Sequence, residues 1–182
     1  MAETAQTVPT LGVSSETMAA ARQDIEYLRR WYAKATDLLG ENTPESIAEG
    51  TKIYHRIFTA DAYIRTSGAT TQPFEATGPD AWAEVANTAL ESYVATQHLI
   101  GTQIVDIHEL TQDAGGTITS GRASMTSYLQ AWHAGEENLW LFIGTYMDEV
   151  RFTPGVGWQI HDMNLVQVSG EHRALGGPRP TP

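Results

Sequence analysis

Four long stretches rich in β-branched and aromatic residues fill the second half of the chain, and they constrain its fold more than any other feature. They span residues 95–108, 117–133, 138–152 and 157–168. Short segments that contain glycine or proline separate them, as the turns of β-hairpins do. The pattern predicts consecutive antiparallel strands. Strands of this length predict a strongly bent sheet, with Gly101 and Gly144 as bend points, because a missing side chain permits a β-bulge.

The first half of the chain has helical spacing instead. Apolar residues recur at steps of three and four between residues 18 and 39, which predicts an amphipathic helix with one buried stripe. Ser14 or Ser15 can cap its beginning, because a hydroxyl accepts hydrogen bonds from the free amides of the first turn. Gly40 fits as its C-terminal stop.

Two further helices and one short strand are expected before residue 93. The helices begin at residues 43–44 and 78–80, where a proline occupies the first turn. Residues 62–67 predict a short strand, and residues 68–77, rich in Thr, Gln and Pro, predict a loop.

Helices followed by a meander of long antiparallel strands indicate an α+β fold. We expect a cone-shaped, strongly curved, mixed or antiparallel sheet wrapped around the N-terminal helices, with an open mouth that can hold a small apolar ligand. Residues 14–168 are expected to form this single domain. Residues 1–13 are interpreted as a disordered arm, and residues 169–182 as a loose tail.

The charge balance narrows the classes of partner. The chain has 182 residues, with 11 Lys and Arg against 22 Asp and Glu, so its formal net charge is −11. This acidity disfavours nucleic acid and anionic membranes as partners. The absence of cysteine excludes disulfides, thiolate metal sites and a cysteine nucleophile. No signal peptide, membrane-spanning stretch, metal site or phosphate-binding loop is evident, and we expect a cytoplasmic, cofactor-free protein.

One histidine stands among the β-forming residues of the first long strand. Its surroundings are Thr96-Gln97-His98-Leu99-Ile100-Gly101-Thr102. Imidazole titrates near neutral pH, so His98 could take and return a proton in a reaction. It could instead be a core histidine with both ring nitrogens hydrogen-bonded, and the residues alone leave both interpretations open.

Four short segments share their order and spacing with a known family. They are Ala95-Thr96-Gln97-His98-Leu99-Ile100-Gly101, Phe58-Thr59-Ala60-Asp61-Ala62, Gly144-Thr145-Tyr146-Met147-Asp148-Glu149 and Gly157-Trp158-Gln159-Ile160. Together they resemble the SnoaL-like branch of the nuclear transport factor 2-like superfamily over residues 25–168. The resemblance implies the cone-shaped fold, which hosts dehydratases, isomerases, cyclases and non-catalytic binding proteins.

Within this superfamily, the Thr-Gln-His tripeptide is most similar to that of the scytalone dehydratases. The resemblance places His98 on that family's catalytic histidine. The segment Tyr32-Ala33-Lys34-Ala35-Thr36-Asp37 resembles the end of the family's first helix and places Asp37 on its catalytic aspartate, which would orient His98. On a regular helix, however, Asp37 lies opposite the apolar stripe, as a solvated carboxylate would.

The chain departs from this family at two positions. A gap-free alignment places Tyr128 where the family has its second histidine, and we expect Tyr128 to donate to a substrate carbonyl or phenolate. Its strand face is polar, which suits a cavity wall and a solvent-exposed face equally. Thr66 falls near the family's pocket tyrosine. These departures indicate a substrate other than scytalone. The histidines interpreted as surface or strand-end residues are His55, His108, His133 and His172.

Further residues are expected to contact the substrate. Arg65 and Arg122 could hold a phenolate or a carboxylate, although exposed salt-bridge partners are the alternative. His161, as a second acid–base group, is expected to face the cavity because it alternates with Met163. The other expected contacts are Tyr54, Thr66, Thr145, Met147 and Met163.

A fainter similarity connects residues 63–66 and the extended second helix to cofactor-free lyases that act on lignin-derived dimers. Together the resemblances imply a cofactor-independent lyase that uses acid–base chemistry on a diaryl or bicyclic phenol and releases water or formaldehyde. An isomerase or polyketide cyclase in the same pocket is one alternative. A non-catalytic binding or assembly subunit is another. In each case we expect a homo-oligomer, a dimer or a trimer.

Overall fold

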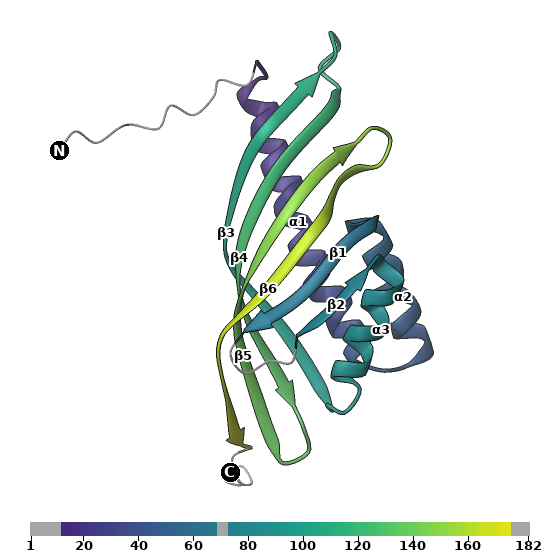
Figure 1. The fold of residues 1–182 in the computed structure, drawn as a ribbon, viewed down its shortest axis with the longest axis vertical. Coiled ribbons are helices and arrows are strands. Elements are labelled where there is room, and N and C mark those ends of the chain that lie inside the picture. The colour runs from purple at the N-terminus through teal and green to yellow at the C-terminus, as the bar shows by residue number, and fades with distance from the viewer. Residues whose placement is uncertain (1–11, 69–72, 176–182) are drawn as a thin grey trace, which may run out of the picture.

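The fold consists of three helices packed against one six-stranded sheet (Figure 1). The computed structural model describes residues 12–68 and 73–175. The elements in chain order are α1 (Ser15–Gly40), α2 (Pro44–Ile57), β1 (Phe58–Gly68), β2 (Phe74–Thr77), α3 (Pro79–Leu90), β3 (Ala95–Gln112), β4 (Ile118–Ala134), β5 (Asn138–Thr153) and β6 (Gly157–Ala174). The strand order is β2-β1-β6-β5-β4-β3. Neighbouring strands are antiparallel except β1 and β6, which are parallel, so the predicted α+β fold with a mixed sheet is confirmed.

Helices α1 and α2 begin where their capping residues predict, and α3 begins at the predicted proline, Pro79. The hydroxyl of Ser14 accepts a hydrogen bond from the backbone amide of Thr17, which satisfies a free donor in the first turn of α1. Thr43 and Ser46 form a reciprocal capping box at the start of α2. Within the described residues, no helix combines the length and the apolar character that crossing a membrane requires.

Two segments expected to be irregular are partly strand. Residues 74–77 form β2, which pairs with β1 through contacts such as Tyr63 with Thr77, so the expected loop at 68–77 is shorter than predicted. Strand β6 continues to Ala174, which pairs with Asn138 of β5. Residues 169–174 therefore belong to the sheet and not to a loose tail. Residues 1–11 of the expected arm and residues 176–182 of the tail lie outside the described residues.

The long strands curve around α1 (Figure 1), and the strand pairing is irregular at both predicted glycines. The pairing of β3 with β4 shifts register between Gly101 and Gln103, and the bulged residue between them, Thr102, has a φ of 23°. The pairing of β5 with β6 shifts between Ile143 and Gly144. A Cβ atom at Gly144 would lie 2.6 Å from the ring of Phe142. Both bend points are confirmed, and the second needs glycine because the neighbouring ring fills the space.

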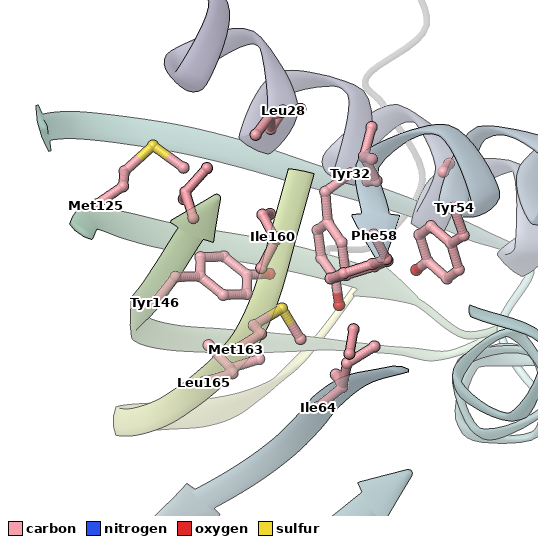
Figure 2. Close-up of a cluster of buried hydrophobic side chains, with 14 of the residues drawn as sticks. Leu28, Tyr32, Tyr54, Phe58, Ile64, Met125, Tyr146, Ile160, Met163 and Leu165 are labelled. Carbon is pink, nitrogen blue, oxygen red and sulfur yellow. The ribbon is translucent and has the colours of Figure 1, made fainter. Parts of the chain in front are cut away.

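The core lies between α1 and the concave face of the sheet. Figure 2 shows Leu28 and Tyr32 of α1 pointing toward residues of the strands, among them Ile160 and Met163. The ring of Tyr32 stacks on that of Tyr54, with centroids 5.4 Å apart and planes 14° from parallel. Helix α1 therefore joins the sheet to α2 through one aromatic cluster.

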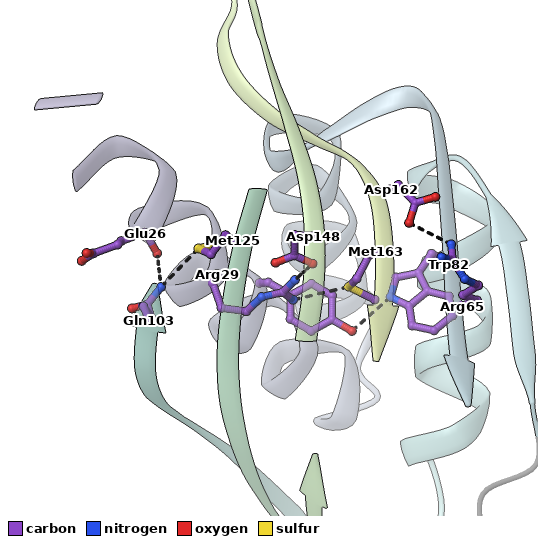
Figure 3. A network of polar contacts seen from close by, with 10 residues as sticks. Glu26, Arg29, Arg65, Trp82, Gln103, Met125, Asp148, Asp162 and Met163 are labelled. Atoms are coloured by element: carbon purple, nitrogen blue, oxygen red, sulfur yellow. Dashed lines mark hydrogen bonds and ion pairs between the residues drawn. The ribbon is translucent and has the colours of Figure 1, made fainter. Parts of the chain in front are cut away.

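A buried ion pair crosses this core (Figure 3). The guanidinium group of Arg29 donates to the carboxylate of Asp148, and both side chains are fully buried. The same guanidinium lies 3.7 Å from the ring centroid of Tyr146 and 4.5 Å from that of Tyr32. Burial raises the pKa of the Asp148 carboxyl, and the positive charge of Arg29 opposes that shift. Each charge is therefore tolerated in the core only because of the other.

We expect the substitution Asp148→Asn to lower the free energy of unfolding by about 3–5 kcal/mol, because it leaves the charge of Arg29 buried without a partner. Urea denaturation followed by circular dichroism measures this loss. Glu109→Gln is the matched control, since Glu109 pairs with Arg122 on the exposed face of the sheet, and it should cost far less. Equal losses from the two substitutions would contradict this account.

Candidate active site

A cavity of about 330 Å³ lies between the concave face of the sheet and helices α1 and α3. This volume is near the lower end of the range of about 300–1,000 Å³ that is usual for small-molecule sites. Most of its wall is aliphatic or aromatic. The helices contribute Tyr32, Thr36, Trp82, Val85, Ala86, Ala89 and Leu90, and the strands contribute Thr66, Phe74, His98, Leu129, Ala131, His133, Trp140, Phe142 and Leu165.

Asp37 and His98 form a hydrogen-bonded pair at this cavity, as the resemblance predicts. Nδ1 of His98 lies 2.7 Å from Oδ1 of Asp37, and only 7% of the His98 side chain is exposed. The carboxylate also accepts hydrogen bonds from the Thr96 hydroxyl at 3.2 Å and from the backbone amide of His98 at 3.3 Å. An ionised carboxylate can only accept, so Nδ1 carries the ring proton and Nε2 of the neutral ring holds a lone pair. No hydrogen bond to Nε2 is found within residues 12–68 and 73–175.

The curvature of the sheet explains how Asp37 reaches His98 from outside the apolar stripe of α1. The edge strand β3 lies against the polar side of the helix. Figure 3 shows Gln103 of β3 beside Glu26 of α1, where its amide donates to the Glu26 carbonyl at 3.1 Å. Further along, the Asp37 carboxylate meets β3 with 22% of its side chain exposed. The sheet therefore contacts two sides of α1. The helical wheel predicted the contact with the apolar stripe but not the contact of the polar side with β3.

His133 is a second histidine in the cavity, and its interpretation as a surface or strand-end residue is wrong. It is 4% exposed. Its Nδ1 lies 3.3 Å from the Trp140 carbonyl, its ring stacks on Trp140 at 4.9 Å, and its centroid is 5.7 Å from that of His98. Burial lowers the pKa of His133 to about 4, with a smaller lowering from the neighbouring His98, so this ring is neutral at pH 7.

A signal for His133 is present in the sequence. It shares the alternation of Ala123, Met125 and Leu129 on β4, which are all buried. It also pairs with Thr96, two residues from His98 on the neighbouring strand. The expectation that the two-histidine arrangement is lost relied on a gap-free alignment, whereas the structure places the ring of His133 beside that of His98.

The Tyr32 hydroxyl is a third polar group on the wall. It accepts a hydrogen bond from Nε1 of Trp82 at 3.2 Å (Figure 3 shows Trp82). Burial raises the pKa of Tyr32, so the phenol stays protonated at neutral pH. Tyr54, expected to contact the substrate, lies behind Tyr32 instead. It is fully buried, and its hydroxyl lies 2.6 Å from that of Thr36.

Only one of the other predicted contacts lines the cavity. Thr66 does so, and its hydroxyl accepts a hydrogen bond from the Phe74 amide at 3.1 Å. Tyr128 does not, and its predicted place in the cavity is wrong. Strand β4 alternates regularly, which places Tyr128 on the outer face with 54% of the residue exposed. The polar face of this strand is therefore solvent-exposed and does not form a cavity wall.

The two strand arginines also lie away from the cavity, and each pairs with a carboxylate. Arg122 pairs with Glu109 on the outer face. Arg65 pairs with Asp162 at 2.8 Å (Figure 3) and, with Met147, lines a separate polar groove. Neither arginine is placed to hold a phenolate or a carboxylate in the cavity.

A bulge explains why the predicted contacts on the last strand are misplaced. Strand β5 pairs Glu149 with Asp162 and Val150 with Ile160, so His161 is the extra residue. The inward alternation therefore restarts at Met163, which is buried in the core beside Arg29, with its sulfur 3.4 Å from Nη1. His161 and Thr145 do not line the cavity.

No metal site emerges from the geometry. Within residues 12–68 and 73–175, no three His, Asp or Glu side chains come together in a way that could hold a metal ion.

His133 should make the folded state acid-sensitive. The unfolded histidine binds a proton below about pH 6.5, whereas the folded one does so only near pH 4. Stability should therefore fall as the pH drops through this window, by up to about 3 kcal/mol. In urea titrations from pH 7 to pH 4, His133→Asn should lose less stability than the wild type. The exposed control His108→Asn should follow the wild type, and a parallel decline of all three proteins would contradict the prediction.

Solved structures share this fold at low sequence identity. A hexachlorocyclohexane dehydrochlorinase LinA-type3 from Novosphingobium barchaimii is 14% identical, with a TM-score of 0.63 over 93% of this chain and 99% of that one. A protein provisionally named a scytalone dehydratase, from Novosphingobium aromaticivorans, is 19% identical, with a TM-score of 0.61 over 87% and 91%. A nuclear transport factor 2-like protein from Salmonella enterica is 12% identical, with a TM-score of 0.55 over 84% and 94%. Such identities establish the fold alone.

The family is established by the sequence. No curated protein matches the chain at a significant level. The sequence model of the SnoaL-like domain matches residues 51–164, which include His98, His133 and most of the cavity wall. As the four short segments predict, the chain belongs to the SnoaL-like domain family.

Proposed function

We propose that this protein is a cofactor-independent lyase that acts by acid–base chemistry on a bicyclic or diaryl phenolic molecule and releases water or formaldehyde. The observation that carries the proposal is the Asp37–His98 pair at an apolar cavity, with Nε2 of His98 without a protein partner in the described residues. Two structural neighbours are named a dehydratase and a dehydrochlorinase. Both names describe eliminations, which supports a lyase.

In this proposal, His98 works as the general base. For loss of water, Nε2 removes a proton from the carbon beside the one that carries the hydroxyl group. The carbon–oxygen bond then breaks, and the imidazolium returns the proton to the departing oxygen. For loss of formaldehyde, Nε2 removes the hydroxyl proton of a hydroxymethyl group. The bond between the hydroxymethyl carbon and its neighbouring carbon then breaks, and the imidazolium returns the proton to that neighbouring carbon. Asp37 stabilises the imidazolium through Nδ1–H.

The Tyr32 hydroxyl supports the same step from α1. Because Trp82 already donates to its oxygen, the phenol can donate its own proton to an oxygen of the substrate that gains negative charge. Such a donor, fixed in an apolar wall, stabilises a developing charge more than water does. In this proposal Tyr32, and not Tyr128 as predicted from the sequence, donates a hydrogen bond to the substrate oxygen.

The two alternatives differ in how well they fit the site. An isomerase or polyketide cyclase would use the same proton transfer, and unchanged product mass would distinguish it. A non-catalytic subunit would need no base oriented toward a cavity, so the Asp37–His98 contact argues against it. The expected dimer or trimer and the cytoplasmic location remain predictions.

The function is tested with a panel of hydroxylated bicyclic and diaryl compounds, with products identified by mass spectrometry. We expect at least one compound to lose a water or a formaldehyde molecule. On that compound, His98→Ala should lower kcat by about 10²–10⁴-fold, the usual contribution of a general base. Asp37→Asn should also lower kcat, because an amide can present its NH₂ to the ring and favour the wrong tautomer.

The matched control is His108→Ala, which removes an exposed histidine from the same strand. It should leave kcat within about twofold of the wild type. If His98→Ala kept kcat within about threefold of the wild type, His98 would not be the base.

A further inference from the structure

Among the residues that the structure describes, the cavity wall holds no basic side chain other than its two histidines. The residues that line it include no Lys or Arg. Two arginines of the same region pair with carboxylates away from the cavity. Arg29 pairs with Asp148 in the core, and Arg65 pairs with Asp162 on the other face of the sheet. The Asp37 carboxylate instead contacts His98, a residue of the cavity wall. A bound anion would therefore lose its hydration without gaining a partner of opposite charge.

In its neutral form, each of the two histidines presents a lone pair at Nε2. Nδ1 of His98 is committed to the Asp37 carboxylate, and Nδ1 of His133 is committed to the Trp140 carbonyl. Carboxylate and carbonyl oxygens can only accept hydrogen bonds, so each Nδ1 carries the proton and each Nε2 of the neutral ring is an acceptor. Two acceptors in an apolar cavity require hydrogen-bond donors on the ligand.

The environment of His133 keeps it neutral. Its ring contacts those of Trp140, at 4.9 Å, and Tyr93, at 5.1 Å. The His98 ring contacts it edge-on at 5.7 Å. Enclosure by aromatic rings, with the neighbouring imidazole, lowers its pKa to about 4. At neutral pH, His133 therefore adds no positive charge that could compensate an anion.

We propose that the cavity selects uncharged hydroxylated aromatic molecules and rejects carboxylates of the same size, with Nε2 of His98 and Nε2 of His133 as the acceptors for the ligand's hydroxyl protons. This inference rests on the proposed function for the use of the cavity as the substrate site. It also replaces the expectation that an arginine holds a phenolate or a carboxylate. The volume of about 330 Å³ favours a compact bicyclic ligand over an extended one.

The test compares 2-naphthol with 2-naphthoate, which share one ring system. At pH 7 the naphthol is neutral, because phenols titrate near pH 10, whereas the carboxylate is ionised. Isothermal titration calorimetry on the full-length protein should give a Kd for 2-naphthol at least tenfold lower than that for 2-naphthoate. An equal or tighter affinity for 2-naphthoate would overturn the proposal, and so would the absence of binding by 2-naphthol.

A pair of lysine variants on α3 tests the electrostatic origin of the selection. Ala89 lines the cavity and is exposed at its rim, so Ala89→Lys brings an ammonium group to the mouth. It should shift the ratio of the two affinities toward 2-naphthoate by at least fivefold. Thr88→Lys adds the same charge to the next exposed position, which does not line the cavity, and should leave the ratio within twofold of the wild type. Equal ratios in the two variants would overturn the electrostatic explanation.

These experiments test the proposed charge selection and the proposed lyase activity separately. If 2-naphthoate bound better while His98→Ala still abolished turnover, the charge selection would be wrong and the lyase proposal would stand. If 2-naphthol bound selectively while His98→Ala kept its turnover, the charge selection would stand and the role of His98 as the base would be wrong.

Discussion

The packing of a bent sheet around α1 is the constraint on which the rest of the structure depends. One side of the helix supplies Tyr32 to the core and to the cavity wall. It also supplies Arg29, whose charge is tolerated in the core because Asp148 of β5 neutralises it. A second side meets the edge strand β3, where Asp37 contacts His98. Because one rigid helix positions all these groups, the core and the site cannot be altered independently.

The cavity borders the aromatic core, and Tyr32 and Trp82 belong to both. Below it, Tyr32, Tyr54 and Phe58 fill the space between the helices and the sheet. Above them, small residues on the wall, such as Ala86 and Ala131, leave room for a ligand. The polar groups on the wall are few and each is fixed by a second protein group. This arrangement suits proton transfer in an apolar environment, where a fixed acceptor or donor has its largest effect.

The periodicity of the sequence predicted the helices, the order of the long strands and the two glycine bends, because these follow from local spacing. Local spacing also separated the two faces of β4, but it could not say which face is covered, so Tyr128 was placed in the cavity and His133 outside it. His161 was misplaced because a bulge inserts one residue, which no alternation pattern reveals. The Asp37–His98 contact came from the family resemblance, since a helical wheel does not include a sheet that wraps around the helix.

The central claim is that Asp37 fixes the tautomer of His98 so that Nε2 is ready to accept a proton. Nitrogen-15 NMR of the histidine rings in the ligand-free protein at neutral pH tests this most directly, with His98 assigned by comparison with His98→Ala. Neutral His98 should carry its proton on Nδ1 and none on Nε2, and Asp37→Asn should shift this balance toward Nε2–H. A wild-type His98 protonated on Nε2 alone would contradict the account.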